Sequence, residues 1–145
     1  MAVEGMKELL AALGELQAGV QLRALRAAAQ AAGRVVVKEA QGRIQVGDRA
    51  HRTHDGNLVA PGFARRSIKA VSYIDKRRGF VGVKIGVRSR AFYAVNFLEL
   101  ERGRSGSRGR PWLVPAFEAS ESKMLDAYRA ALQRAVNKAR AKGKK

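Results

Sequence analysis

The chain has 145 residues, no cysteine and a formal net charge of +17 at pH 7. Its length suits a single domain with a real apolar core, and the lack of cysteine excludes disulfides and thiolate metal sites. No apolar run approaches the roughly 20 residues of a membrane-spanning helix, and the N-terminus lacks a signal-peptide pattern. We therefore expect a soluble, unexported protein with no membrane partner.

The positive charge is concentrated in the last two thirds of the chain. Residues 1–50 carry seven basic and five acidic side chains, residues 51–100 ten and three, and residues 101–145 twelve and four. A charge of this size favours a polyanionic neighbour, either nucleic acid or an acidic protein surface. The alternative is that the cations only keep the surface soluble.

Two helices are predicted in the N-terminal third. Apolar side chains recur at helical spacing over residues 6–16 and again over residues 20–40, where an alanine-rich composition also favours helix. Gly33 and the valines at 35–37 both disfavour helix. We therefore expect a kink near Gly33.

A polar segment follows, from Gly42 to Pro61, and it is predicted to be a flexible loop because Gly, Asp, His, Asn and Pro dominate it. Its length suggests disorder or a contact arm that orders against a neighbour. It holds the one cluster of candidate metal ligands, which is His51, His54 and Asp55 with Asp48 nearby. A solvated turn explains these residues better, so we predict no metal and no cofactor.

A β-hairpin is predicted next, with strands over residues 67–74 and 80–87. In the second strand, apolar residues alternate with glycine and lysine. Residues 75–79 supply the turn, with a glycine for its left-handed position, and three consecutive basic residues, Lys76, Arg77 and Arg78, at its tip. Because an isolated two-stranded ribbon is marginally stable in water, it must pack on helices or join a larger sheet.

The segment from Ala91 to Ala119 combines three features. Residues 91–100 predict a short aromatic helix, and residues 102–110 alternate arginine with glycine and serine, which predicts a mobile loop. Residues 111–114 follow as an extended apolar stub. Pro115 then takes the first position of a new helix, where its missing N–H costs nothing.

The C-terminal helix is predicted to be long, with an apolar stripe that runs from Phe117 to Val136. Acidic residues near its start and basic residues near its end suit the helix dipole. Residues 142–145 are expected to form a disordered basic tail. The whole chain then reads as one α+β domain over residues 1–141, with two N-terminal helices, a hairpin in a small, mostly antiparallel sheet, the aromatic helix and the long C-terminal helix.

Catalytic patterns are weak throughout the sequence. The twelve acidic residues are scattered, no Ser/His/Asp order stands out, and neither glycine-rich segment ends in the Gly-Lys-Ser/Thr that a phosphate loop needs. We expect no enzymatic activity. A nuclease, resting on His51, His54 and the neighbouring aspartates, is a minor alternative.

Three short sequence blocks, in this order, resemble a known family. They are G-F-A-R-R-S-I at residues 62–68, F-Y-A-x-x-F-L-E at 92–99 and R-P-W-L-x-P-A-F at 110–117. Together they resemble the tail-completion or head-tail joining (neck) proteins of tailed bacteriophages, over residues 6–139 in order of elements. One departure is the polar connection between Ala40 and Pro61, which is longer than the family's usual one. The family-motif and core anchors are then Arg66, Ser67, Ile68, Phe92, Tyr93, Phe97, Leu98, Glu99, Pro111, Trp112, Leu113, Pro115 and Phe117.

The resemblance implies a virion structural protein at the head-tail interface, assembled in the host cytoplasm. Such a protein forms a ring, with six subunits as the expected number, at the head-proximal end of the tail. Its implied partners are other copies of itself, the tail tube or terminator protein, the capsid connector proteins and the genomic DNA that passes through the lumen.

The basic segments are candidate contacts to DNA or to partner proteins. No aromatic residue lies within residues 102–110, so any DNA contact there is to backbone phosphates. A solvated loop and a partner-protein contact remain open alternatives. The chief rival to the virion role is a basic protein that binds nucleic acid without sequence specificity. The candidate contact residues are Lys76, Arg77, Arg78, Arg102, Arg104, Arg108 and Arg110.

Overall fold

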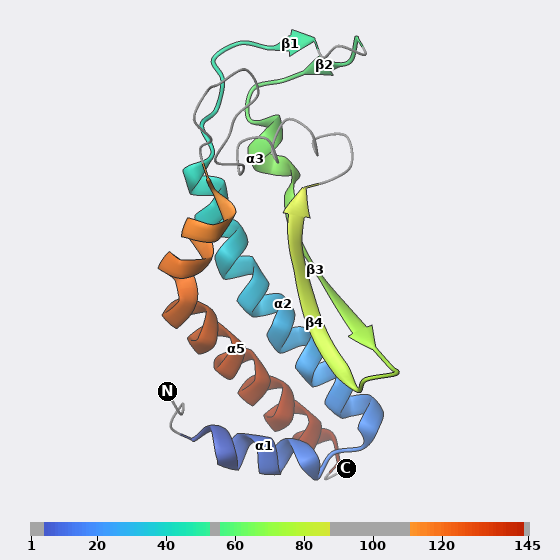
Figure 1. Ribbon diagram of the computed structural model, residues 1–145. Helices are drawn as coiled ribbons and strands as arrows, with labels where there is room; N and C mark the ends of the chain where they lie inside the picture. Colours follow the sequence, from blue (N-terminus) through green and yellow to red (C-terminus); the bar gives the residue numbers. More distant parts are fainter. Residues whose placement is uncertain (1–4, 53–55, 88–110, 144–145) are drawn as a thin grey trace. The chain divides into compact units, whose positions relative to one another are not determined.

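The computed structural model describes residues 5–52, 56–87 and 111–143 (Figure 1). In chain order the described elements are α1 (Met6–Gly14), α2 (Ala18–Arg43), β1 (His51–Arg52), β2 (Leu58–Val59), α3 (Phe63–Ser67), β3 (Ile68–Asp75), β4 (Phe80–Val87) and α5 (Leu113–Gly143). The α+β class is confirmed. The predicted aromatic helix over 91–100 and the predicted loop over 102–110 lie outside the described residues. Among the described helices, none is both long and apolar enough to cross a bilayer.

The two N-terminal helices are confirmed, and the second continues through Gly33 without a break in its helical residues. α2 is helical without interruption from Ala18 to Arg43. Gly33 is buried and Val36 is fully buried. Packing of this face outweighs the weak helix propensity of glycine and valine, because most helix stability in proteins comes from tertiary contacts.

The loop predicted over residues 42–61 contains more regular structure than expected. Its first two residues belong to α2, and β1 and β2 pair antiparallel, with His51 opposite Val59 and Arg52 opposite Leu58. Gly56 has a φ of 76°, in the left-handed region that suits glycine, and its carbonyl accepts a hydrogen bond from Arg52 Nη1 at 2.9 Å. The segment therefore carries a small hairpin of its own.

The main hairpin is confirmed, with β3 and β4 as neighbours in a two-stranded sheet (Figure 1). Gly79 takes the left-handed conformation in the turn, with a φ of 60°. Asp75 Oδ1 accepts hydrogen bonds from the backbone N–H groups of Arg77 and Arg78, at 3.0 and 3.3 Å. The carboxylate thus holds the turn and leaves its basic side chains exposed.

The long C-terminal helix is confirmed, but its predicted ends are wrong. α5 begins at Leu113, two residues before Pro115, and continues through Gly143, so residues 142 and 143 belong to the helix. Pro115 is still tolerated because it lies in the first turn, where a backbone N–H would have no partner within the helix. Consequently Leu113 and Val114 of the predicted extended stub are helical, and the described residues 111 and 112 lie just before the helix.

The described residues form two compact units. Unit 1 comprises those within Met1–Val35, Val71–Lys84 and Ser122–Lys145, and unit 2 those within Val36–Ala70 and Ile85–Glu121. α2, α5 and the main hairpin contribute residues to both units. The single domain predicted over residues 1–141 stays a prediction.

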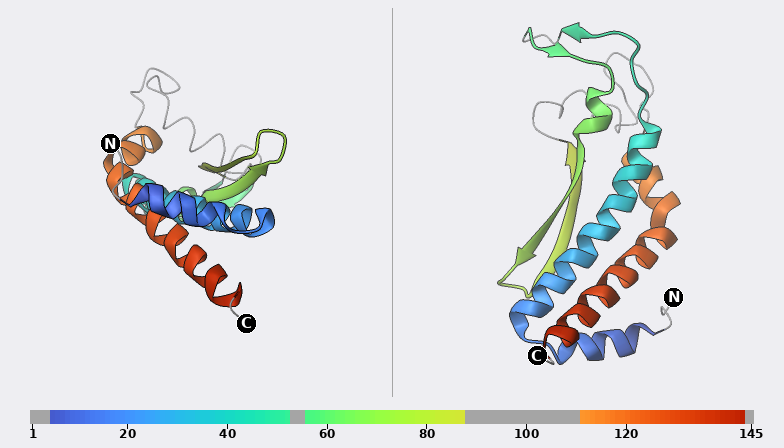
Figure 2. Two further views of the ribbon diagram at one scale, coloured as in Figure 1. Left: turned by 90° about the horizontal axis from the view of Figure 1, so that it is seen from below. Right: turned by 180° about the vertical axis from the view of Figure 1, so that it is seen from behind.

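The core of unit 1 lies where three helices pack together (Figure 2). Its buried residues are Leu9, Leu13, Ala24, Ala28, Ala131, Leu132 and Val136. The hairpin joins this unit through α2, because the Ser72 N–H donates to Gln30 Oε1 and Arg26 Nε donates to Ser72 Oγ, both at 3.0 Å. This contact meets the expectation that the hairpin must pack on a helix.

Candidate functional site

A second apolar cluster, in unit 2, brings together two of the sequence blocks that carry the family resemblance. Ile68 is fully buried at the start of β3, and Trp112 is 2% exposed just before α5. They share one cluster with Ala40, Ile44 and Ala116. We call this set the motif cluster. It shows that the described residues of the two blocks, 62–68 and 111–117, meet through the core of one unit.

The helix α3 shapes the first of these blocks. Gly62 precedes it with a φ of 74°, a conformation that favours glycine, and the Gly62 carbonyl accepts the Arg66 N–H at 3.0 Å. Ser67 is buried, and its Oγ donates to the Phe63 carbonyl at 2.7 Å. The turn of helix therefore delivers Ile68 directly into the motif cluster.

Arginine side chains tie this block to its surroundings within unit 2. Arg65 Nη2 donates to the Ile44 carbonyl, near the end of α2, at 3.0 Å. Arg66 is exposed, and its Nη1 donates to the Pro61 carbonyl at 3.1 Å. Arg65 rather than the predicted Arg66 thus makes the cross-link to α2.

The predicted anchors of the second block divide between core and surface. Trp112 is buried and Leu113 packs against the motif cluster, whereas Pro111 is exposed and Pro115 is half-buried. Phe117 is 48% exposed, so its prediction as a core anchor is wrong. The remaining predicted anchors, Phe92, Tyr93, Phe97, Leu98 and Glu99, lie outside the described residues.

The buried stripe of α5 explains why Phe117 faces outward. Ala116 is fully buried and Ser120 is 2% exposed. These residues follow Trp112 at intervals of four, so Phe117 falls off the stripe. Neither residue was predicted to be buried, because alanine and serine are weak hydrophobic signals, although their four-residue spacing from Trp112 could have identified them.

The basic residues of the hairpin turn, Lys76, Arg77 and Arg78, are exposed, and their role as contacts stays a prediction. Arg78 lies 4.0 Å from Asp75 in an exposed ion pair, a geometry that contributes little. We call these three residues the cationic turn. The other predicted contacts, Arg102, Arg104, Arg108 and Arg110, lie outside the described residues.

The candidate metal ligands gain no support as a group. His51 is exposed in β1 and Asp48 is exposed before it, while His54 and Asp55 lie outside the described residues. Within the described ranges, no three histidine or acidic side chains cluster closely enough to hold a metal ion.

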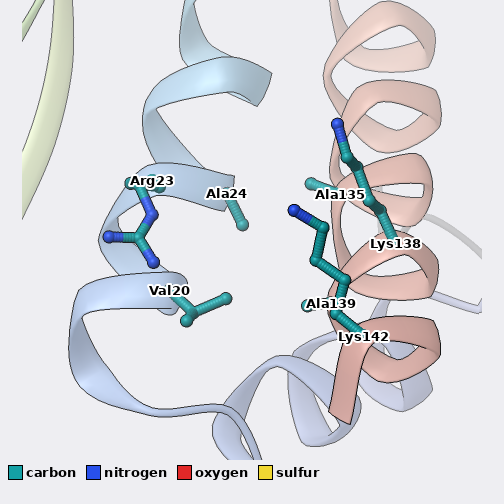
Figure 3. Close-up of a pocket in the computed structure, with 7 residues that line it drawn as sticks. All are labelled: Val20, Arg23, Ala24, Ala135, Lys138, Ala139 and Lys142. Atoms are coloured by element: carbon teal, nitrogen blue, oxygen red, sulfur yellow. The ribbon is translucent and has the colours of Figure 1, made fainter. Parts of the chain in front are cut away.

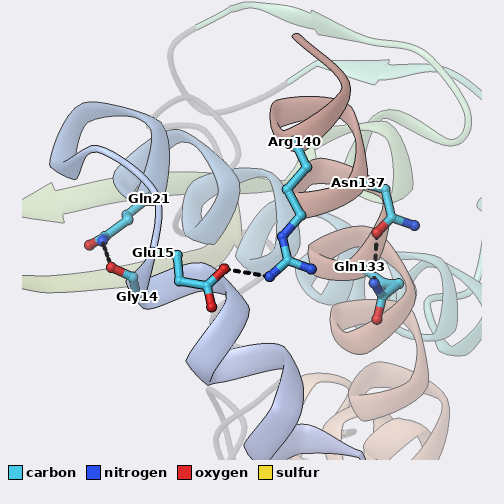
Figure 4. Close-up of polar contacts among 6 residues, drawn as sticks. All are labelled: Gly14, Glu15, Gln21, Gln133, Asn137 and Arg140. Atoms are coloured by element: carbon cyan, nitrogen blue, oxygen red, sulfur yellow. Dashed lines mark hydrogen bonds and ion pairs between the residues drawn. The ribbon is translucent and has the colours of Figure 1, made fainter. Parts of the chain in front are cut away.

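Polar contacts fasten the ends of the helices in unit 1 (Figure 4). Gln21 Nε2 donates to the Gly14 and Leu16 carbonyls, at 3.1 and 2.6 Å, and so caps the end of α1. Glu15 forms an ion pair with Arg140 of α5 at 2.6 Å. Burial against the unit 1 core raises the pKa of the Tyr128 phenol.

The chemistry of the motif cluster is structural. The hydroxyl groups of Ser67 and Ser120 donate to carbonyls within their own helices, at 2.7 and 2.6 Å, and are buried there. The cationic turn, in contrast, offers exposed charge suited to an anionic partner. Comparison of the chain with models of protein families, with curated proteins and with solved structures finds no match.

Proposed function

We propose that this chain is a virion structural protein of the tail-completion or head-tail joining kind. The observation that carries the proposal is the motif cluster, in which Ile68 of the first resembling block and Trp112 of the third are buried together. The resemblance rests on these blocks occurring together, and a shared core gives a physical reason why they would occur together. The proposal assigns the chain no catalytic activity.

The proposed assembly is a ring, with six subunits as the expected number, at the head-proximal end of a phage tail. A ring needs apolar surface for contacts between subunits. Two exposed apolar side chains support this in unit 2, because Val114 is 57% exposed, Phe117 is 48% exposed, and their spacing of three residues puts them on one side of α5. We infer that this pair contributes to the contact between subunits.

The proposed partners follow from the charge. In a ring, seventeen excess positive charges per subunit must face DNA or acidic connector surfaces rather than each other. The cationic turn is the described segment best suited to that contact. Because exposed like charges repel and salt screens them, assembly of the isolated protein should strengthen as the salt concentration rises from low to moderate.

Electron microscopy of the purified chain at moderate salt tests this proposal. Closed rings are expected. Phe117→Lys should disperse them while leaving the fold intact, because the side chain is exposed. Lys123→Met, which alters another exposed position of α5, is the control and should leave the rings whole.

The rival function is binding of nucleic acid without sequence specificity, which the cationic turn also favours. On that account the chain is a monomer or dimer that binds DNA tightly and forms no ring. A small particle that binds duplex DNA with nanomolar affinity would support the rival and count against the joining role. The position of the gene, between connector and major tail genes, is a further observation that separates the two.

A further inference from the structure

A pocket opens in unit 1 between the start of α2 and the end of α5 (Figure 3). Its volume is about 430 Å³, within the usual range of roughly 300 to 1,000 Å³ for small-molecule sites. α2 supplies one wall and α5 the other. The lining residues are Val20, Arg23, Ala24, Ala135, Lys138, Ala139 and Lys142.

Three of the lining side chains are cationic. Among the described residues, no acidic side chain lines the pocket. Arg23 comes from α2, whereas Lys138 and Lys142 come from α5, one helical turn apart. Figure 3 shows the Lys142 side chain extending from α5 toward α2. The pocket lining therefore draws basic residues from two segments that are far apart in the sequence. In Figure 3 the Arg23 guanidinium lies on the side of α2 away from α5, and the Lys138 side chain runs along α5.

The neighbouring Arg140 differs from the three lining cations because it has an acidic partner. Its guanidinium is neutralised by Glu15 at 2.6 Å, outside the pocket lining. Within the described ranges, Arg23, Lys138 and Lys142 form no such ion pair. Like charges one turn apart on a helix destabilise it, so a bound anion between them would relieve that repulsion.

The remaining lining residues are small and apolar. Ala24, Ala135 and Ala139 leave the space that larger side chains would fill, and Val20 completes the apolar wall. Such a wall suits a ligand in which the anion is joined to an organic body. Lysine and arginine are the side chains that most often bind phosphate groups.

We propose that this pocket binds the phosphate group of a nucleotide unit, with Lys142 as the first contact, Arg23 and Lys138 turning toward the phosphate from the rim, and the apolar wall against the sugar or base. Two sources offer this chemistry, a free nucleotide and a nucleotide within a nucleic-acid strand. The inference concerns unit 1 alone and does not depend on the proposed ring.

Titration of the isotopically labelled full chain, followed by amide chemical shifts in a phosphate-free buffer, tests the site. Adenosine monophosphate should give saturable shifts in residues 20–24 and 135–142, whereas adenosine, which lacks the phosphate, should give none. Tighter binding of a short single-stranded oligonucleotide than of the monophosphate would identify a strand as the source, and the reverse order would identify a free nucleotide. Binding of inorganic phosphate as tightly as the monophosphate would overturn the role of the apolar wall.

Two pairs of variants separate the pocket from general surface charge. Lys138→Gln with Lys142→Gln should weaken binding of the monophosphate by about a hundredfold, since each of the two lost charge-assisted hydrogen bonds costs about tenfold. The control, Lys7→Gln with Lys123→Gln, removes the same charge from exposed helix positions and should change binding less than about twofold.

The second pair leaves the charge unchanged. Ala139→Leu fills the pocket and should abolish the shifts, whereas Ala141→Leu, on an exposed position of the same helix outside the lining, should not. The assignment is overturned if the monophosphate produces no saturable shifts at these residues. It is equally overturned if the control variants weaken binding as much as the pocket variants.

Discussion

The two cores of this protein are built differently. In unit 1, burial is shared among small and medium side chains from three helices, with Ala24, Ala28 and Ala131 among the buried residues. In unit 2, one large aromatic side chain, Trp112, packs with Ile44, Ile68 and two alanines in the motif cluster, and these residues come from segments far apart in the sequence. A core that depends on one large side chain should be more sensitive to a single truncation than a core of many small contacts.

The largest expected effect is that of Trp112→Ala in unit 2. Removing a buried aromatic side chain should lower the free energy of unfolding by about 3 to 5 kcal/mol, because a cavity replaces it. Urea denaturation followed by circular dichroism measures the loss. Phe117→Ala, which truncates an exposed aromatic side chain on the same helix, should cost less than about 1 kcal/mol. Equal losses for the two variants would remove the special role of Trp112.

The matching truncation in unit 1 is Leu132→Ala, at a fully buried position of α5. We expect a smaller loss of unfolding free energy, about 2 to 3 kcal/mol, because helices that meet through small residues can close part of the cavity. Leu125→Ala, at a position that is 42% exposed, is the control for this denaturation experiment. A loss for Leu132→Ala greater than that for Trp112→Ala would reverse the comparison.

The contact between α2 and the hairpin in unit 1 should have a moderate effect. Gln30→Ala removes the acceptor of the Ser72 N–H. It should lower the free energy of unfolding by about 1 to 2 kcal/mol, because a buried donor then loses its partner. Hydrogen exchange of the Ser72 amide should become faster. Gln30→Glu retains an acceptor oxygen and should restore the protection, whereas unchanged exchange in Gln30→Ala would show that the contact is dispensable.

The smallest expected effect is that of Glu15→Gln, which breaks the exposed ion pair with Arg140. The substitution should lower the free energy of unfolding by about 0.2 to 1 kcal/mol at low salt. This loss should shrink as added salt screens the pair. Thermal denaturation at two salt concentrations measures the difference. A loss that does not depend on salt would show that the ion pair is not its cause.

The same contrast between the units explains what could be predicted from the sequence. Helical spacing identified α1, α2 and most of α5, because each has an apolar stripe that packs in unit 1. The resemblance singled out Ile68 and Trp112, which periodicity alone would not have paired. The exposed Phe117 and the ends of α5 were mispredicted, because tertiary packing decides them.

The pocket could not be predicted for a related reason. The sequence marks Arg23 and Lys138 as residues of polar helix faces, the helix dipole accounts for Lys138, and Lys142 was predicted to lie in a disordered tail. Only the packing of the start of α2 against the end of α5 brings them around one space. Ala116 and Ser120 were missed in the same way, since small side chains reveal burial only once their neighbours are known.

The mass of the assembled particle tests the central claim most directly. Sedimentation of the purified chain at moderate salt should give a closed particle near six times the protomer mass of 15.8 kDa, and Phe117→Lys should reduce it to smaller species. A particle that stays at one or two protomer masses at every salt concentration, and that binds duplex DNA tightly, would contradict the joining role.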